Sequence, residues 1–135
     1  PVAIETGQIV VDRLVMAADA GVVVNPLTAS GQIEGGILQS LGYALCEEMA
    51  YDEEGKPRET DFIGYHLMRS DEMPEIQSIF VETFEPSHPY GVKSVGEVVL
   101  NPTAPAIGNA VANAVGVHVD DLPITPERVW RALKA

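Results

Sequence analysis

Glu97 is the residue in this sequence best suited to acid–base chemistry. It ends the glycine-flanked segment Gly91–Glu97, and between Pro86 and Val119 the only other charged residue is Lys93. A carboxylate among valine neighbours should be desolvated, and desolvation favours its protonated form. Such a glutamate suits general-base work near neutral pH. The structural alternatives are a salt bridge to Lys93 and the capping of a backbone N–H group.

The glycine-rich segment Gly31–Gly36 is a second chemically suggestive pattern, because it falls inside an expected helix. A glycine costs a helix about 1 kcal/mol relative to alanine, so three glycines in so short a run need a reason. On a helical projection, Gln32 lies on a polar side opposite the apolar residues Ile33, Ile37 and Leu41. That side also carries Gly35, Gly36, Gln39 and Tyr43. It suits close approach by a ligand, with tight helix packing as the alternative, and the segment lacks the Gly-Lys-Ser/Thr of a phosphate-binding loop.

The other reactive residue types form no recognisable site. His66, His88 and His118 lack the short spacing of metal ligands, so we expect no metal-ligating set among them. A single cysteine, Cys46, excludes an internal disulfide and Cys-based zinc or iron–sulfur sites, and it is interpreted as a small buried hydrophobic residue. Ser94 has no His–Asp partner pattern, which gives nucleophilic catalysis little support.

The charge balance excludes several classes of function. The chain has 135 residues, a net charge of −12 and 46% hydrophobic residues, which indicates one globular domain. So negative a charge argues against nucleic-acid binding. We see no apolar run long enough to span a membrane and no signal peptide, so the sequence predicts a cytoplasmic protein.

The charges are also unevenly distributed along the chain. Residues 47–75 contain ten acidic and three basic residues, a pattern typical of a solvated face. Residues 86–119 are nearly uncharged and should form interior or interface. The remaining positions must therefore supply the elements that hold Gln32 and Glu97.

The residue pattern predicts strands over residues 8–18 and 75–85 and three helices. Asn25-Pro26 should cap and open the first helix, which runs to about Met49 and buries Ile33, Ile37, Leu41 and Leu45. The segment Val98–Pro102 repeats the pattern of Val22–Pro26, a short apolar run followed by Asn-Pro, which hints at internal duplication. It should precede a second helix that ends at Gly116. A third helix starts at Thr125-Pro126. The expected fold class is α+β, with helices packed on a small mixed β-sheet.

With these elements in place, two motifs together resemble the molybdenum hydroxylase family of xanthine dehydrogenase and aldehyde oxidase. They are Gly31–Gly42 (Gly-Gln-Ile-Glu-Gly-Gly-Ile-Leu-Gln-Ser-Leu-Gly) and Lys93–Glu97 (Lys-Ser-Val-Gly-Glu). The resemblance extends in order over nearly the whole chain, through Asp19–Gly21, Asn25-Pro26, Pro102, Pro105–Ile107 and Asn109-Ala110.

The resemblance implies a site and an activity. Glu97 would be the general base that activates a water-derived oxygen for attack on an aldehyde or on an N-heteroaromatic or purine carbon. One wall of a molybdopterin (molybdenum cofactor) site would be formed by Gln32, Lys93, Ser94, Val95 and Gly96. The last four would contact the cofactor mainly through their backbone groups. Many eukaryotic relatives have Gly-Glu-Pro-Pro where this chain has Gly-Glu-Val-Val, which affects the expected shape of the loop.

The resemblance also implies partners. Most of the family's cofactor shell lies upstream of this part, so residues 1–135 are interpreted as the C-terminal segment of a molybdopterin-binding domain, a fragment of a larger subunit. Pro1 in place of methionine agrees with a fragment, although methionine removal is an alternative. We expect iron–sulfur clusters and FAD on other domains or subunits, a small-molecule substrate, and an isolated chain that binds no cofactor, is inactive and self-associates. The alternatives are a reductive relative similar to the 4-hydroxybenzoyl-CoA reductases and a non-catalytic scaffold domain.

Overall fold

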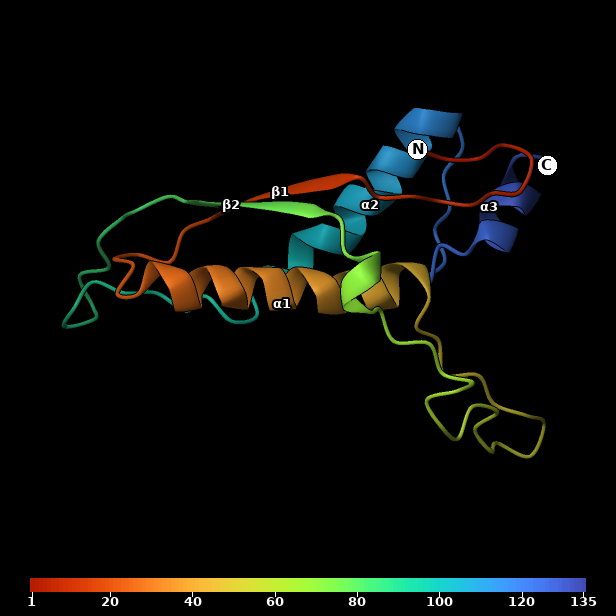
Figure 1. Ribbon diagram of the computed structural model, residues 1–135, viewed down its shortest axis with the longest axis horizontal. Helices are drawn as coiled ribbons and strands as arrows, with labels where there is room; N and C mark the ends of the chain where they lie inside the picture. Colours follow the sequence, from red (N-terminus) through yellow and green to blue (C-terminus); the bar gives the residue numbers. More distant parts are fainter.

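The computed structural model describes all 135 residues. Its regular elements are three helices and a two-stranded sheet, which pack together (Figure 1). This arrangement confirms the predicted α+β class. In chain order the elements are β1 (Arg13–Ala18), α1 (Pro26–Leu45), the 3-10 turn η1 (Ser70–Glu72), β2 (Glu75–Phe80), α2 (Leu100–Val115) and α3 (Pro126–Ala132).

The sheet is a parallel pair rather than a mixed sheet. Arg13 is paired with Glu75 at one end of the register and Ala18 with Phe80 at the other. Parallel strands need a long crossover, and α1 with the segment after it supplies one. Side chains alternate along β1, so that Met16 and Ala18 are buried while Val15 and Ala17 are exposed. Both strands are shorter than predicted.

Helix α1 begins as the sequence predicts. The Asn25 side chain accepts hydrogen bonds from the backbone N–H groups of Leu27 (3.1 Å) and Thr28 (3.2 Å), and Pro26 is the first helical residue. The side chains of Ile33, Ile37 and Leu41 are fully buried and face the sheet and α2. The helix ends at Leu45, one turn earlier than predicted.

Helix α2 starts differently from the prediction. Val99 is its N-cap and Leu100 its first residue, so Val98–Leu100 forms no strand and the expected strand–Asn-Pro–helix repeat is wrong. Pro102 is tolerated inside the first turn because N–H groups there have no intrahelical partner. Gly116 ends the helix in the left-handed conformation at φ 79°, as its position predicts.

The acidic stretch of residues 47–75 is largely solvated, as its charge predicts. Its first part, about residues 50–64, extends away from the helices and the sheet (Figure 1). The nearly uncharged stretch of residues 86–119 is divided, because Val99, Ile107 and Val111 are buried while other positions on α2 are exposed. No helix of this chain is long and apolar enough to cross a membrane.

Candidate functional site

Two segments that carry sequence-predicted site residues meet beside the N-terminal half of α1. Residues from the segments 20–32 and 92–95 line a groove of about 400 Å³. Gln32, Lys93 and Val95 are among the lining residues, so the predicted proximity of Gln32 to the Glu97 loop is confirmed. Their role toward a cofactor stays a prediction.

The loop that precedes Glu97 is fastened to the end of β1 by backbone hydrogen bonds. The N–H group of Lys93 donates to the carbonyl of Ala20 (2.8 Å), and that of Val22 donates to the carbonyl of Gly91 (2.9 Å). Gly21 has a φ of +63°, and a Cβ at this position would lie 2.3 Å from the Gly91 carbonyl oxygen. Only glycine meets both requirements, so this close approach explains the glycine at position 21.

Lys93 forms an ion pair, but with a residue other than Glu97. Its ammonium lies 2.6 Å from Oδ2 of Asp19, the residue that directly follows β1. The sequence alternative of a Lys93–Glu97 salt bridge is therefore wrong. The hydrogen bonds that Asp19 accepts from Lys93, Gly21 and Thr83 lower its pKa to about 2. Sequence reasoning missed this contact because the two residues lie 74 positions apart.

Glu97 itself is exposed in this chain, contrary to the burial expected from its valine neighbours. Of its valine neighbours, Val99 is fully buried against α1 and Val98 is exposed, while Glu97 occupies the turn that opens α2. The carbonyl of Glu97 accepts a hydrogen bond from the N–H group of Leu100 (3.0 Å). Its carboxylate is in neither an ion pair nor a hydrogen bond with another residue of the chain.

The C-terminal side of the loop is held by α1. Ser40 and Tyr43 both donate hydrogen bonds to the carbonyl of Leu100, at 3.1 Å and 2.8 Å. Gly36 faces Val99 so closely that a Cβ on the glycine would lie 2.2 Å from Val99 Cγ2. Gly36 therefore serves helix packing, and the prediction that it shares the open polar side of α1 with Gln32 is wrong. Gly35 is exposed with nothing near it, as predicted for that side.

The remaining predicted wall residues differ in their surroundings. Ser94 is exposed and does not line the groove. Val95 is half-buried and packs against the hydrophobic core. Gly96 is half-buried, and its carbonyl oxygen lies 3.6 Å from where a Gly36 Cβ would be. Gln32 is exposed within the groove, where its amide can both donate and accept hydrogen bonds.

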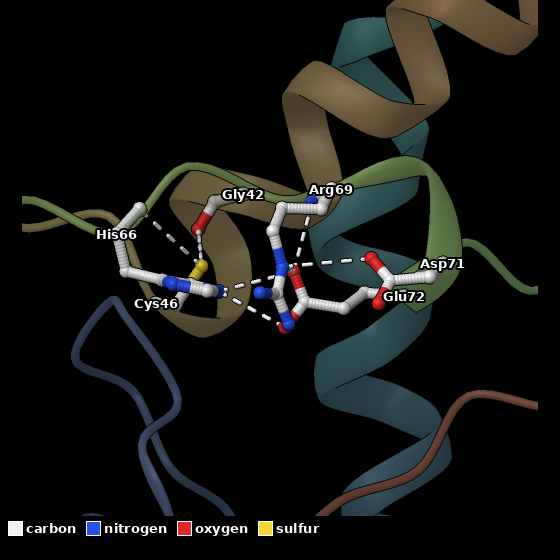
Figure 2. A network of polar contacts seen from close by, with 6 residues as sticks. All are labelled: Gly42, Cys46, His66, Arg69, Asp71 and Glu72. Atoms are coloured by element: carbon white, nitrogen blue, oxygen red, sulfur yellow. Dashed lines mark hydrogen bonds and ion pairs between the residues drawn. The ribbon is translucent and has the colours of Figure 1, made fainter. Parts of the chain in front are cut away.

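A separate polar network lies at the other end of α1 (Figure 2). The His66 ring contacts both carboxylate oxygens of Glu72 at 3.1 Å, and the Cys46 thiol contacts the carbonyls of Gly42 and His66. The backbone N–H of Arg69 lowers the pKa of Glu72, and burial raises the pKa of Cys46. A thiol with a raised pKa is a poor nucleophile, and the contact of Cys46 with the His66 carbonyl joins this segment to the end of α1. No group of three or more His, Cys, Asp or Glu residues could hold a metal ion.

Comparison with known proteins identifies the family. Residues 1–74 match the family model described as "Molybdopterin cofactor-binding domain". The chain is similar to the xanthine dehydrogenase molybdenum-binding subunit of Escherichia coli O157:H7, with 40% identity over 124 residues, which is 91% of this chain and 16% of that protein. It is also 40% identical over 129 residues to the gamma subunit of the 6-hydroxypseudooxynicotine dehydrogenase complex of Paenarthrobacter nicotinovorans, over 93% of this chain and 16% of that protein.

A solved structure gives the same result. The aldehyde oxidoreductase of Desulfovibrio gigas superposes with a TM-score of 0.89 at 36% identity, over 99% of this chain and 14% of that one. The chain thus spans about one sixth of the length of the curated relatives it matches. Because the family model covers more than half of its residues, the chain belongs to the molybdopterin cofactor-binding domain family.

Proposed function

We propose that this chain is part of a molybdenum-dependent hydroxylase, with Glu97 as its general base and the groove beside Gln32 as one wall of the pterin site. Residues 1–135 would be the C-terminal segment of that molybdopterin-binding domain. The observation that carries the proposal is the meeting of Gln32 with Lys93 and Val95 in one groove. Glu97 follows Val95 by two residues in the same loop, and its exposed carboxylate has no partner. The relatives' names, which include a xanthine dehydrogenase and an aldehyde oxidoreductase, support the reaction class.

The chemistry of the groove fits a pterin. Its lining contains no carboxylate, and its hydrogen-bonding side chains are the neutral Asn25, Thr28 and Gln32. Neutral amides and hydroxyls pair well with the amide-like donors and acceptors of a pterin ring, and the absence of an acid avoids repulsion of its phosphate. The only charged lining residue is Lys93. These residues would hold one side of the cofactor, and the other side must come from outside this chain.

The role of Glu97 follows from proton balance. Converting a substrate C–H group to C–OH with oxygen from water releases two electrons and two protons. The molybdenum cofactor, when bound, would accept the two electrons together with the proton of the C–H bond that breaks. Glu97 would take one proton from the attacking oxygen as the C–O bond forms, because its carboxylate is exposed and uncommitted. Gln32 would orient the cofactor without exchanging a proton, since an amide does not titrate in this range.

The proposal extends to partners. The rest of a molybdenum subunit would cover the open side of the groove, and iron–sulfur and FAD domains or subunits would carry the electrons onward. The substrate would be a small aldehyde or an N-heteroaromatic or purine ring, in keeping with the names of the relatives. A cytoplasmic location stays a prediction.

Glu97→Gln in the enzyme that contains this chain tests the proposal. The amide keeps the shape of the side chain but cannot take the proton, so we expect turnover to fall by about 10²–10⁴-fold. Molybdenum content should stay at the wild-type level. Glu53→Gln, in the exposed acidic loop, is the matched control and should leave turnover unchanged. Wild-type turnover by fully loaded Glu97→Gln enzyme would overturn the assignment.

A further inference from the structure

Asp19 connects three segments that are far apart in the sequence. Its Oδ1 accepts hydrogen bonds from the N–H group of Gly21 (2.9 Å) and from the hydroxyl of Thr83 (2.8 Å). Its Oδ2 accepts one from the ammonium of Lys93 (2.6 Å). One carboxylate thus joins the end of β1, the segment after β2 and the start of the loop that leads to Glu97.

Backbone contacts alone leave part of this loop unconstrained. The bonds between residues 20–22 and residues 91–93 end at Lys93, and the next fixed point is the Leu100 carbonyl, which Ser40 and Tyr43 hold. Residues 94–97 span the interval; Ser94 and Glu97 in it are exposed, and Val95 packs against the hydrophobic core. The side chain of Lys93 therefore makes the last polar contact that can fix the direction in which the chain enters this interval.

We propose that Asp19 is a positioning residue for Glu97, which acts by binding Lys93 and so fixing the start of the 94–97 interval. The inference rests on the proposed function of Glu97. Asp19 and Lys93 each expose 35% of their side chains, and ion pairs at such exposure contribute little to folding stability. The role of this ion pair is consequently to fix the position of the loop, and its removal should leave the fold intact.

Asp19 also keeps the Lys93 ammonium from other acids. Lys93 lies four residues before Glu97, and the Glu85 carboxylate is close enough to feel its charge. Without Asp19, the ammonium is free to move toward these acids, which adds to the loss of positioning.

The test is Asp19→Asn in the enzyme that contains this chain. Asparagine can still accept the Gly21 and Thr83 bonds, but its amide gives Lys93 no charged partner. We expect kcat to fall about 10- to 100-fold with KM and molybdenum content unchanged, as for a reacting group misplaced by about 1 Å. Hydrogen–deuterium exchange at the amides of residues 94–97 should accelerate several-fold, whereas exchange in α1 should not.

Two further readouts separate positioning from chemistry. Asp19 stays ionised down to about pH 2, so the pH dependence of kcat between pH 5 and 10 should keep its shape in Asp19→Asn. Lys93→Arg retains a cation for Asp19 and should restore most of the kcat lost in Lys93→Met. Lys93→Met breaks the same pair from the other side and replaces Asp19→Asn if that variant does not fold. Asp120→Asn, at an exposed acid outside the 91–97 loop, is the control.

The outcomes are distinct from those of the Glu97 experiment. Unchanged exchange at residues 94–97 in Asp19→Asn would overturn the positioning role, whatever the activity. Faster exchange with wild-type kcat, in an enzyme that Glu97→Gln inactivates, would overturn it as well. If Glu97→Gln keeps full activity, the base assignment fails instead, and the exchange measurement still decides whether Asp19 holds the loop.

Discussion

Gly36→Ala should destabilise this chain even though alanine is the better helix former. The new Cβ would lie 2.2 Å from Val99 Cγ2, whereas carbon atoms pack best at about 3.5–4.0 Å. Val99 is fully buried and has a single stiff side-chain torsion, so relief requires a backbone shift at the start of α2. Overpacking of this kind typically costs about 1–3 kcal/mol.

Gly35→Ala is the matched control for this change. The two glycines are adjacent in α1, but a Cβ at Gly35 meets nothing within 4 Å. The control should therefore show only the helix-propensity gain of about 0.5–1 kcal/mol. Because both variants gain the same propensity, the difference between them isolates the overlap with Val99. We expect Gly36→Ala to be less stable than Gly35→Ala by about 1–3 kcal/mol.

A double-mutant cycle with Val99→Ala sharpens the test. Val99→Ala alone removes two buried methyl groups, a loss of about 1.6 kcal/mol at about 0.8 kcal/mol for each, before any cavity term. In the double variant the nearest remaining atoms, Val99 Cβ and the Gly96 carbonyl oxygen, lie at an ordinary 3.6 Å from the new Cβ. The double variant should thus be more stable than the sum of the single effects by about 1–3 kcal/mol.

Urea unfolding of the 135-residue variants, followed by circular dichroism, measures these free energies. Equal m-values would show that the variants unfold between comparable states. Equal stability of Gly36→Ala and Gly35→Ala, or an additive double-mutant cycle, would refute the close contact between α1 and the start of α2. Val99 lies two residues after Glu97 in the sequence, so a shift of Val99 should also move Glu97. Gly36→Ala should therefore lower turnover in the assembled enzyme as well.

Two other predictions concern the start of α1 and the isolated chain. Asn25→Ala removes the acceptor of two N–H groups and should lower the unfolding free energy by about 1 kcal/mol. Asn113→Ala, at an exposed position within α2, is the control and should not destabilise the chain. A wild-type urea midpoint for Asn25→Ala would contradict the cap. The isolated chain should bind no molybdenum cofactor and should self-associate, because the groove is open and large apolar side chains such as Leu27 and Ile63 are exposed. Metal analysis and sedimentation velocity check this, and stoichiometric molybdenum with turnover in the 135-residue chain would contradict it.

Local sequence determined the helices of this protein, because caps and apolar spacing act over a few residues. Asn25, Gly116 and Thr125 mark helix ends where the structure has them, and Ile33, Ile37 and Leu41 form the buried face of α1. The beginning of α2 was not determined in this way. Val98–Leu100 has the composition of a strand, but no neighbouring strand is available to pair with it, and the packing of Val99 on Gly36 starts a helix instead.

The sequence also singled out Gln32 and the Lys93–Glu97 loop as one site, and the structure brings Gln32 together with Lys93 and Val95. Only the tertiary structure decided how these residues are held. The partner of Lys93 is Asp19, and Glu97 is exposed in the turn that precedes α2. Such contacts join residues up to 74 positions apart, and neither periodicity nor composition carries information about them. They depend on how β1, α1 and α2 pack against one another, and this packing is a property of the whole chain rather than of any local segment.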